Sequence, residues 1–239
     1  MRTMSVPRRK ISVSSKQKPL RIAILGQNGV GKSALTVRFI TRRFIGEYDP
    51  DLEKVYACSR CIDGDTVTLE LLDTAAQEEK CRLEDHIKWA EAYILMYSVT
   101  DRCSFSEVSR LKFLINSYSK KQRKSVTSPD SVMMSTPVVL VANQIDRIHD
   151  RMVTQDEGFQ RSLELGCLSF YEISVRENVD SVSNIFEDIY LMCRKPRKCR
   201  QQLCKQLSLP AFINEDKPEE TFDPSSSLNR RRKAIFTVS

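Results

Sequence analysis

The chain has 239 residues, of which 41% are hydrophobic, and 38 basic against 31 acidic side chains give it a formal net charge of +7. This length suits one ordinary domain with tails or two small domains, and the apolar content excludes a globally disordered chain. The longest apolar runs, near residues 92–99 and 137–142, are too short to span a bilayer, so no transmembrane helix is expected.

The net charge is concentrated at the two ends. Residues 1–21 carry seven basic and no acidic side chains, and residues 194–239 carry eleven basic and five acidic ones, which leaves 20 basic and 26 acidic for residues 22–193. An acidic body between basic tails is not typical of a nucleic-acid-binding domain, so no nucleic acid is expected as a partner. We expect the segments 1–19 and 196–239 to be disordered tails, with contact to anionic lipids as the alternative.

Apolar runs alternate with helical patterns along the middle of the chain. The expected order is strand 20–25, helix 32–43, strands 55–62 and 66–72, strand 92–99, helix 105–118, a surface loop 119–136, strand 137–143, helix 154–165, strand 168–174 and helix 182–192. Asp63-Gly64-Asp65 predicts a hairpin turn between the second and third strands. The alternation predicts an α/β domain over residues 20–195, with a mostly parallel six-stranded sheet covered by helices on both faces.

A phosphate-binding pattern lies between the first strand and the first helix. Residues 26–33 read Gly-Gln-Asn-Gly-Val-Gly-Lys-Ser and fit G-x-x-x-x-G-K-[ST] in the required strand-to-helix context. Backbone N–H groups of such a loop and the positive helix N-terminus converge on phosphate oxygens. Lys32 is expected to reach the terminal phosphates and the Ser33 hydroxyl to ligate Mg²⁺.

Further polar residues stand at the ends of later strands. Asp73 is placed to hold a water on Mg²⁺, and the Asp146 carboxylate can accept two hydrogen bonds from a guanine edge, which adenine cannot donate. Backbone N–H groups at Ser174 and Val175 can meet the guanine oxygen. The carboxyl ends of strands are where open α/β sheets bind ligands.

Together these motifs resemble the Ras family of small GTPases over about residues 20–195. The segment 36–50, Thr-Val-Arg-Phe-Ile-Thr-Arg-Arg-Phe-Ile-Gly-Glu-Tyr-Asp-Pro, is especially similar to the Ras-like, estrogen-regulated growth inhibitor branch. The resemblance implies a P-loop small GTPase fold, binding of GTP/GDP with Mg²⁺, slow GTP hydrolysis, and two switch segments, 46–56 and 74–85, that meet protein effectors or regulators.

The resemblance also assigns roles to single residues. It implies that Phe44 packs against guanine and that Gln77, the candidate catalytic residue, orients the attacking water. The candidate metal ligands are Ser33 and Asp73. The candidate nucleotide-binding residues are Gly26, Gln27, Asn28, Gly29, Val30, Gly31, Lys32, Ser33, Ala34, Phe44, Asp73, Thr74, Ala75, Ala76, Asn143, Gln144, Asp146, Ser174 and Val175.

Four residues depart from the family pattern. Asp51 replaces a threonine that ligates Mg²⁺, and its charge would lie near the γ-phosphate. Ala76 replaces a switch glycine and restricts the backbone there. Asn28 would crowd an activating arginine and Gln77. Gln144 replaces a lysine that lies along the base and braces the phosphate loop, so affinity is expected to fall.

These departures leave alternatives open. We expect a weak GTPase, with a non-hydrolysing nucleotide-binding scaffold as the second hypothesis. A P-loop small-molecule kinase is disfavoured, because no lid-like arginine cluster is evident and the guanine-reading residues are present. The terminal residues 236–239 contain no prenylation cysteine. Cysteines and bases in 193–205 and the basic run 230–233 suggest palmitoylation, anionic membrane contact or nuclear import, so a cytoplasmic protein with a nuclear or peripheral membrane fraction is expected.

Overall fold

A computed structural model describes residues 18–49, 52–74, 80–123 and 136–194. The tails expected over 1–19 and 196–239 therefore lie outside the described residues, apart from residues 18 and 19. Asp51, Ala75, Ala76 and Gln77 lie outside them as well. In the described part of the chain, no helix combines the length and apolarity needed to cross a membrane.

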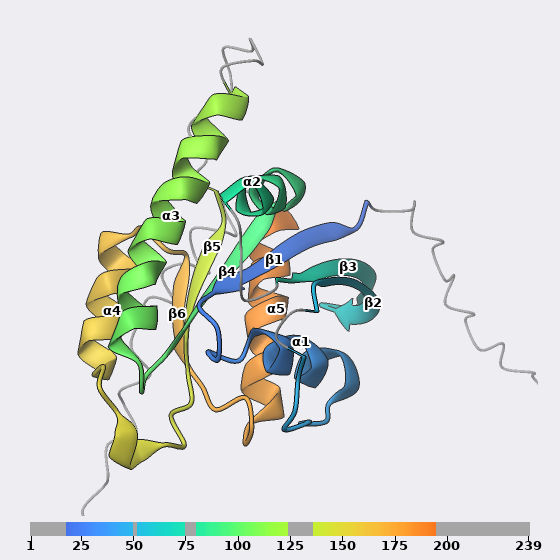
Figure 1. The fold of residues 1–239 in the computed structure, drawn as a ribbon. Coiled ribbons are helices and arrows are strands. Elements are labelled where there is room, and N and C mark those ends of the chain that lie inside the picture. The colour runs from blue at the N-terminus through green and yellow to red at the C-terminus, as the bar shows by residue number, and fades with distance from the viewer. Residues whose placement is uncertain (1–17, 50–51, 75–79, 124–135, 195–239) are drawn as a thin grey trace, which may run out of the picture. The chain divides into compact units, whose positions relative to one another are not determined.

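One six-stranded sheet organises the domain (Figure 1). Its strands are β1 (Leu20–Gly26), β2 (Lys54–Ile62), β3 (Asp65–Asp73), β4 (Ala92–Ser98), β5 (Val138–Asn143) and β6 (Ser169–Glu172). Their order is β2-β3-β1-β4-β5-β6, with β2 antiparallel to β3 and every other neighbouring pair parallel. The expected α/β fold, with a mostly parallel six-stranded sheet, is confirmed.

Helices cover both faces of this sheet (Figure 1). They are α1 (Lys32–Thr41), α2 (Lys80–Trp89), α3 (Arg102–Arg123), α4 (Gln155–Glu164) and α5 (Val179–Arg194), with a short 3₁₀ helix η1 (Ile148–Asp150). Along β1, Ile22 and Ile24 join a core with α1 and α5, whereas Ala23 and Leu25 join a second core with α2 and α3. The alternation of side chains across a strand thus supplies both cores from one buried run.

The hairpin turn is shorter than the sequence pattern suggested. Ile62 pairs with Asp65, so only Asp63 and Gly64 form the turn, with φ of 54° and 84°. Positive φ at both central residues fits the right-handed twist of a hairpin, and Asp and Gly tolerate it. Asp65 therefore begins β3.

The structure also corrects three helix assignments. Helix α2 was not predicted, although Leu83 and Ile87 lie four residues apart and face the core. Helix α3 continues through residue 123, so 119–123 are helical and the rest of the expected loop, 124–135, lies outside the described residues. Helix α5 starts at Val179, because the Asn178 side-chain oxygen accepts the N–H groups of the second and third helical residues at 3.0 and 2.9 Å.

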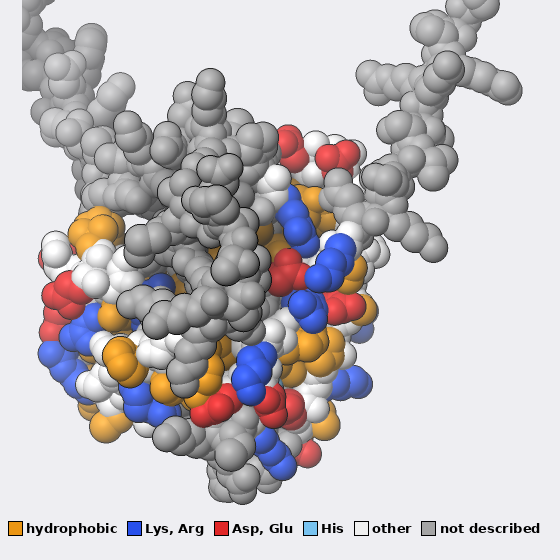
Figure 2. Space-filling view, turned by 90° about the horizontal axis from the view of Figure 1, so that it is seen from above, with side chains coloured by type: hydrophobic (Ala, Val, Ile, Leu, Met, Phe, Trp, Pro, Cys, Tyr) orange, Lys and Arg blue, Asp and Glu red, His pale blue; other side chains and the backbone are white. Residues whose placement is uncertain are grey.

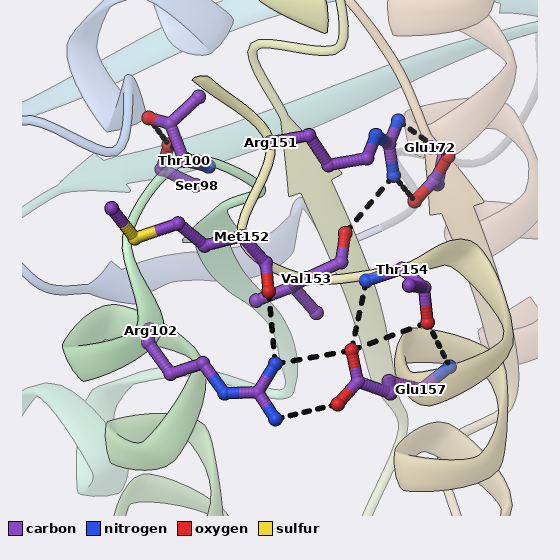
Figure 3. Close-up of polar contacts among 9 residues, drawn as sticks. All are labelled: Ser98, Thr100, Arg102, Arg151, Met152, Val153, Thr154, Glu157 and Glu172. Carbon is purple, nitrogen blue, oxygen red and sulfur yellow. Dashed lines mark hydrogen bonds and ion pairs between the residues drawn. The ribbon is translucent and has the colours of Figure 1, made fainter. Parts of the chain in front are cut away.

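The segment between β5 and α4 is clamped from several sides (Figure 3). Arg151 pairs with Glu172 of β6 at 2.8 Å, and Arg102 of α3 pairs with Glu157 of α4 at 2.5 Å. Thr154 and Glu157 form a reciprocal capping box at the start of α4. These contacts hold the loop that follows Asp146 against the sheet.

Charged side chains of both signs share the face seen in Figure 2. Lys and Arg side chains lie interspersed with Asp and Glu among the described residues visible there. Such mixing is typical of a solvated surface rather than a surface that follows a phosphate backbone.

Gly158 allows α4 to lie close to the sheet. A Cβ at this position would lie 2.3 Å from Tyr97 Oη and 2.6 Å from Phe170 Cζ, and Tyr97 is fully buried. We predict that Gly158→Ala lowers the free energy of unfolding by about 1–3 kcal/mol because α4 must move outward. Urea unfolding measures this, with the exposed Gln160→Ala on the same helix as the control. Equal stability of the two variants would contradict the close packing.

Candidate functional site

A groove runs along the carboxyl ends of the central strands. It consists of two hollows of about 230 and 270 Å³. The residues lining both are Gly29, Gly31, Ala34, Gly46 and Tyr48. One hollow is lined by Lys32, Ser33 and Thr74, and the other by Phe44, Asn143 and Asp146. The chemistry of the two hollows matches the phosphate and base ends of a nucleotide. We therefore call the one with Lys32 the phosphate hollow and the one with Asp146 the base hollow.

Two glycines allow the phosphate loop its path. A Cβ on Gly26 would lie 2.3 Å from the carbonyl oxygen of Met96 in the neighbouring strand. Gly31 has φ of 101°, and its Cβ would lie 2.3 Å from Asn143 Nδ2. The pattern of glycines is therefore required by close approach of β4 and β5, not only by the turn itself.

The loop ends in a helix start that suits an anion. Gly31 is the N-cap of α1, and within the described chain no side chain caps this helix and no acid lies in its first turn. Lys32 Nζ donates to the carbonyl oxygens of Gly26 at 2.9 Å and Gln27 at 3.0 Å, which holds the ammonium at the loop. Uncapped N–H groups and a nearby cation form an electropositive site for phosphate.

Asp73, at the end of β3, is the buried acid of the site. It is 2% exposed, and burial raises the pKa of its carboxyl to about 6, while a hydrogen bond from Ser33 and the charge of Lys32 act in the opposite direction. Among the described residues, its Oδ1 has no hydrogen-bond partner. A carboxylate with a free buried oxygen beside a hydroxyl fits Mg²⁺.

Ser33 and Asp73 are the described residues suited to hold such an ion. The described part of the chain holds no group of three or more His, Cys, Asp or Glu side chains suited to a metal. Because Mg²⁺ is commonly held by one or two protein ligands together with waters and phosphates, Ser33 and Asp73 fit it when a nucleotide is present.

Asn143 joins the two halves of the groove. Its Nδ2 donates to the carbonyl oxygen of Val30 at 2.8 Å, and its Oδ1 accepts the N–H of Val175 at 3.1 Å. The Val175 N–H, expected to meet a guanine oxygen, thus already has an acceptor. The buried Ser174 accepts the N–H of Glu177 at 3.2 Å and shapes the same turn. Asn143 therefore acts here as a brace between the phosphate loop and the turn at 174–175.

Other candidates take varied positions. Phe44 is 39% exposed at the edge of the base hollow. Gln27 and Asn28 are exposed on the phosphate loop, and Val30 is buried beneath it. The Thr74 hydroxyl donates to the carbonyl oxygen of Ile24 at 2.8 Å, so it ties β3 to β1.

Comparison with known proteins agrees with this geometry. The family model described as the Ras family matches residues 21–195. The chain belongs to the Ras family. It is 42% identical over 186 residues to the Ras-related and estrogen-regulated growth inhibitor of Bos taurus, covering 78% of this chain and 85% of that protein.

Two further relatives extend this range. Ras-like protein family member 12 of Bos taurus is 36% identical over 199 residues, covering 83% of this chain and 68% of the relative. Protein ras-2 of Neurospora crassa is 34% identical over 224 residues, covering 89% and 95%. The Ras family consists of small GTPases, so the fold and the groove chemistry agree with the chain's relatives.

Five residues of the Ras-family groove were not among the candidates, and Asp49 in the phosphate hollow is one of them. Gly46 and Tyr48 line both hollows, and Arg147 and Arg176 line the base hollow. The Tyr48 hydroxyl accepts the N–H of Ile45 at 3.2 Å. Arg147 and Arg176 directly follow candidate residues, and this adjacency was the available signal. The sequence offered no such signal for Tyr48, because its segment meets the phosphate loop only in the folded structure.

One of the segments expected to meet protein partners is tied to helix α2 at a residue just beyond the other segment. Glu53, which precedes β2, pairs with His86 of α2 at 3.0 Å, and His86 is buried. His86 lies one residue beyond the expected segment 74–85. The pair therefore connects the residues before β2 to helix α2.

Without a metal ion, the buried and ionised Asp73 carboxylate destabilises the folded state. We predict that Asp73→Asn raises the free energy of unfolding of the nucleotide-free protein by about 2 kcal/mol at pH 7, because an acid with a raised folded-state pKa destabilises the fold once ionised. The gain must shrink as the pH falls from 7 towards 4, where the wild-type carboxyl takes up its proton. Urea unfolding in a chelator across this range, with exposed Asp85→Asn as control, measures it. A gain independent of pH would contradict the burial argument.

Proposed function

We propose that the protein is a Ras-like guanine-nucleotide switch that converts GTP and water slowly to GDP and phosphate. The observation that supports this best is a groove of two adjoining hollows, with the uncapped loop, Lys32 and Ser33 at one end and Asp146 at the other. Buried Asp73 lies behind the first end and accepts a hydrogen bond from Ser33. A nucleoside di- or triphosphate is the ligand whose charge and base match both ends.

The roles of the residues follow from their chemistry. The loop N–H groups and Lys32 neutralise phosphate oxygens. The Asp146 carboxylate selects guanine by accepting hydrogen bonds from two adjacent N–H groups of the base. Ser33 and Asp73 would hold Mg²⁺, which supplies charge neutralisation at the phosphates. Gln77 would orient the attacking water.

A non-hydrolysing switch or scaffold is the second candidate. Asn28 is exposed and lines the phosphate hollow, so its side chain occupies space beside the outer phosphate. With Asp51 and Ala76 in the switch segments, this favours weak hydrolysis and altered switching. Protein effectors or regulators would meet 46–56 and 74–85, while the basic tails would permit anionic membrane contact or a nuclear fraction.

Guanine selection is the first test. In Mg²⁺, labelled GDP and GTP are expected to bind. ATP should bind at least ~100-fold more weakly, because adenine lacks the two adjacent N–H donors that guanine offers to the Asp146 carboxylate. Asp146→Ala should lower the affinity for GDP by at least ~100-fold, because two charge-assisted hydrogen bonds to guanine are lost. Fluorescence titration measures this, with exposed Asp156→Ala as the control. Failure of both guanine nucleotides to bind the wild type would refute the function.

Hydrolysis separates the two candidates. We predict slow phosphate release in single turnover of bound GTP, reduced at least ~10-fold in Gln77→Leu, because the leucine cannot orient a water. Binding of GDP by this variant, which should be retained, controls for folding. Absence of phosphate release from GTP bound to the wild type would favour the scaffold.

A further inference from the structure

Gln144 occupies a left-handed backbone position directly after β5, with φ of 69°. Its Nε2 donates to the carbonyl oxygen of Gly29 at 2.9 Å. Its Oε1 accepts from the hydroxyls of Ser98 at 2.6 Å and Thr100 at 3.3 Å. One side chain therefore spans from the end of β4 to the phosphate loop.

The Gly29 carbonyl and the two hydroxyls together fix which end of the amide faces the loop. The Gly29 carbonyl can only accept, so the amide nitrogen must point toward it. Ser98 Oγ accepts the N–H of Thr100 at 3.1 Å, which leaves its own hydrogen for Gln144 Oε1. The two hydroxyls lie 2.8 Å apart (Figure 3), and with the Ser98 hydrogen on Gln144, the Thr100 hydroxyl donates either to Ser98 Oγ or to Gln144 Oε1. A flipped amide would face the Gly29 oxygen with another acceptor.

Gln144 and Asn143 hold consecutive carbonyls of the phosphate loop. Asn143 binds the carbonyl oxygen of Val30, and Gln144 binds that of Gly29. In a trans peptide the C=O and N–H groups point in opposite directions. Holding these two oxygens on the β5 side therefore turns the N–H groups of Val30 and Gly31 toward the opposite side of the loop.

We propose that Gln144, oriented by Ser98 and Thr100, is a positioning residue that presents the Val30 N–H to a nucleotide phosphate. This inference rests on the proposed function and gives a positioning role to the Gln144 amide, which was expected to lower nucleotide affinity relative to lysine. A lysine carries three equivalent donors and needs no orientation, whereas an amide works in one orientation only. The hydroxyl pair is thus required by glutamine and dispensable for lysine at the same position.

The dissociation rate of fluorescent GDP in Mg²⁺ tests this dependence. Gln144→Glu keeps the shape but places a carboxylate oxygen against the Gly29 carbonyl, so GDP release is expected to accelerate at least ~10-fold. Ser98→Ala with Thr100→Val should accelerate release ~5-fold or more when residue 144 is glutamine, and less than ~2-fold in the Gln144→Lys background. Thr100→Val alone provides a milder variant, since Ser98 is buried. Ser106→Ala on the exposed side of α3 is the matched hydroxyl control.

The outcomes separate the brace from a general structural role. Equal acceleration by the hydroxyl variants in the glutamine and lysine backgrounds would show that Ser98 and Thr100 act through the fold, and would overturn the proposal. Unchanged GDP release in Gln144→Glu would also overturn it. Thermal unfolding confirms that each variant is folded. Absence of GDP binding to the wild type would instead refute the proposed function.

Discussion

The groove depends on the two hydrogen bonds of the buried Asn143 amide. They join the phosphate loop at Val30 to the turn at Val175, two segments nearly the whole domain apart in sequence. Gly31 must lack a side chain because this amide lies where its Cβ would be. Because an unpaired buried amide is costly, the three segments are held together as one unit. The geometry of both hollows follows from that single constraint.

Electrostatics then divide the groove into two functional ends. At the phosphate end, Lys32 and the start of α1 are electropositive, and the Asp73 carboxyl is buried beside them with its pKa raised. Such an arrangement is unfavourable when empty and favourable when an anion and a metal ion complete it. The chain thus accepts a less stable local structure in exchange for a site that is preorganised for a metal–phosphate ligand.

Departures from the family pattern have different consequences in the structure. Gln144 is accommodated by two hydroxyls on β4 and its following turn, so its loss of charge is matched by directed hydrogen bonds. Asn28 instead is exposed on the loop surface and lines the phosphate hollow. The pair Glu53–His86 ties the segment before β2 to helix α2.

The amino-acid sequence by itself determined the α/β class, the strand order along the chain, the phosphate loop and the acids at strand ends, because these depend on local periodicity and spacing. The sequence did not predict α2, because only Leu83 and Ile87 of this helix give an apolar pattern toward the core. It also did not predict the full extent of α3, because the last turns of that helix are polar. Only the tertiary structure decided that Asn143 joins the phosphate loop to the turn at 174–175, that Tyr48 lines both hollows, and that Ser98 and Thr100 orient Gln144. Those roles arise from contacts between residues distant in sequence, which no local pattern encodes.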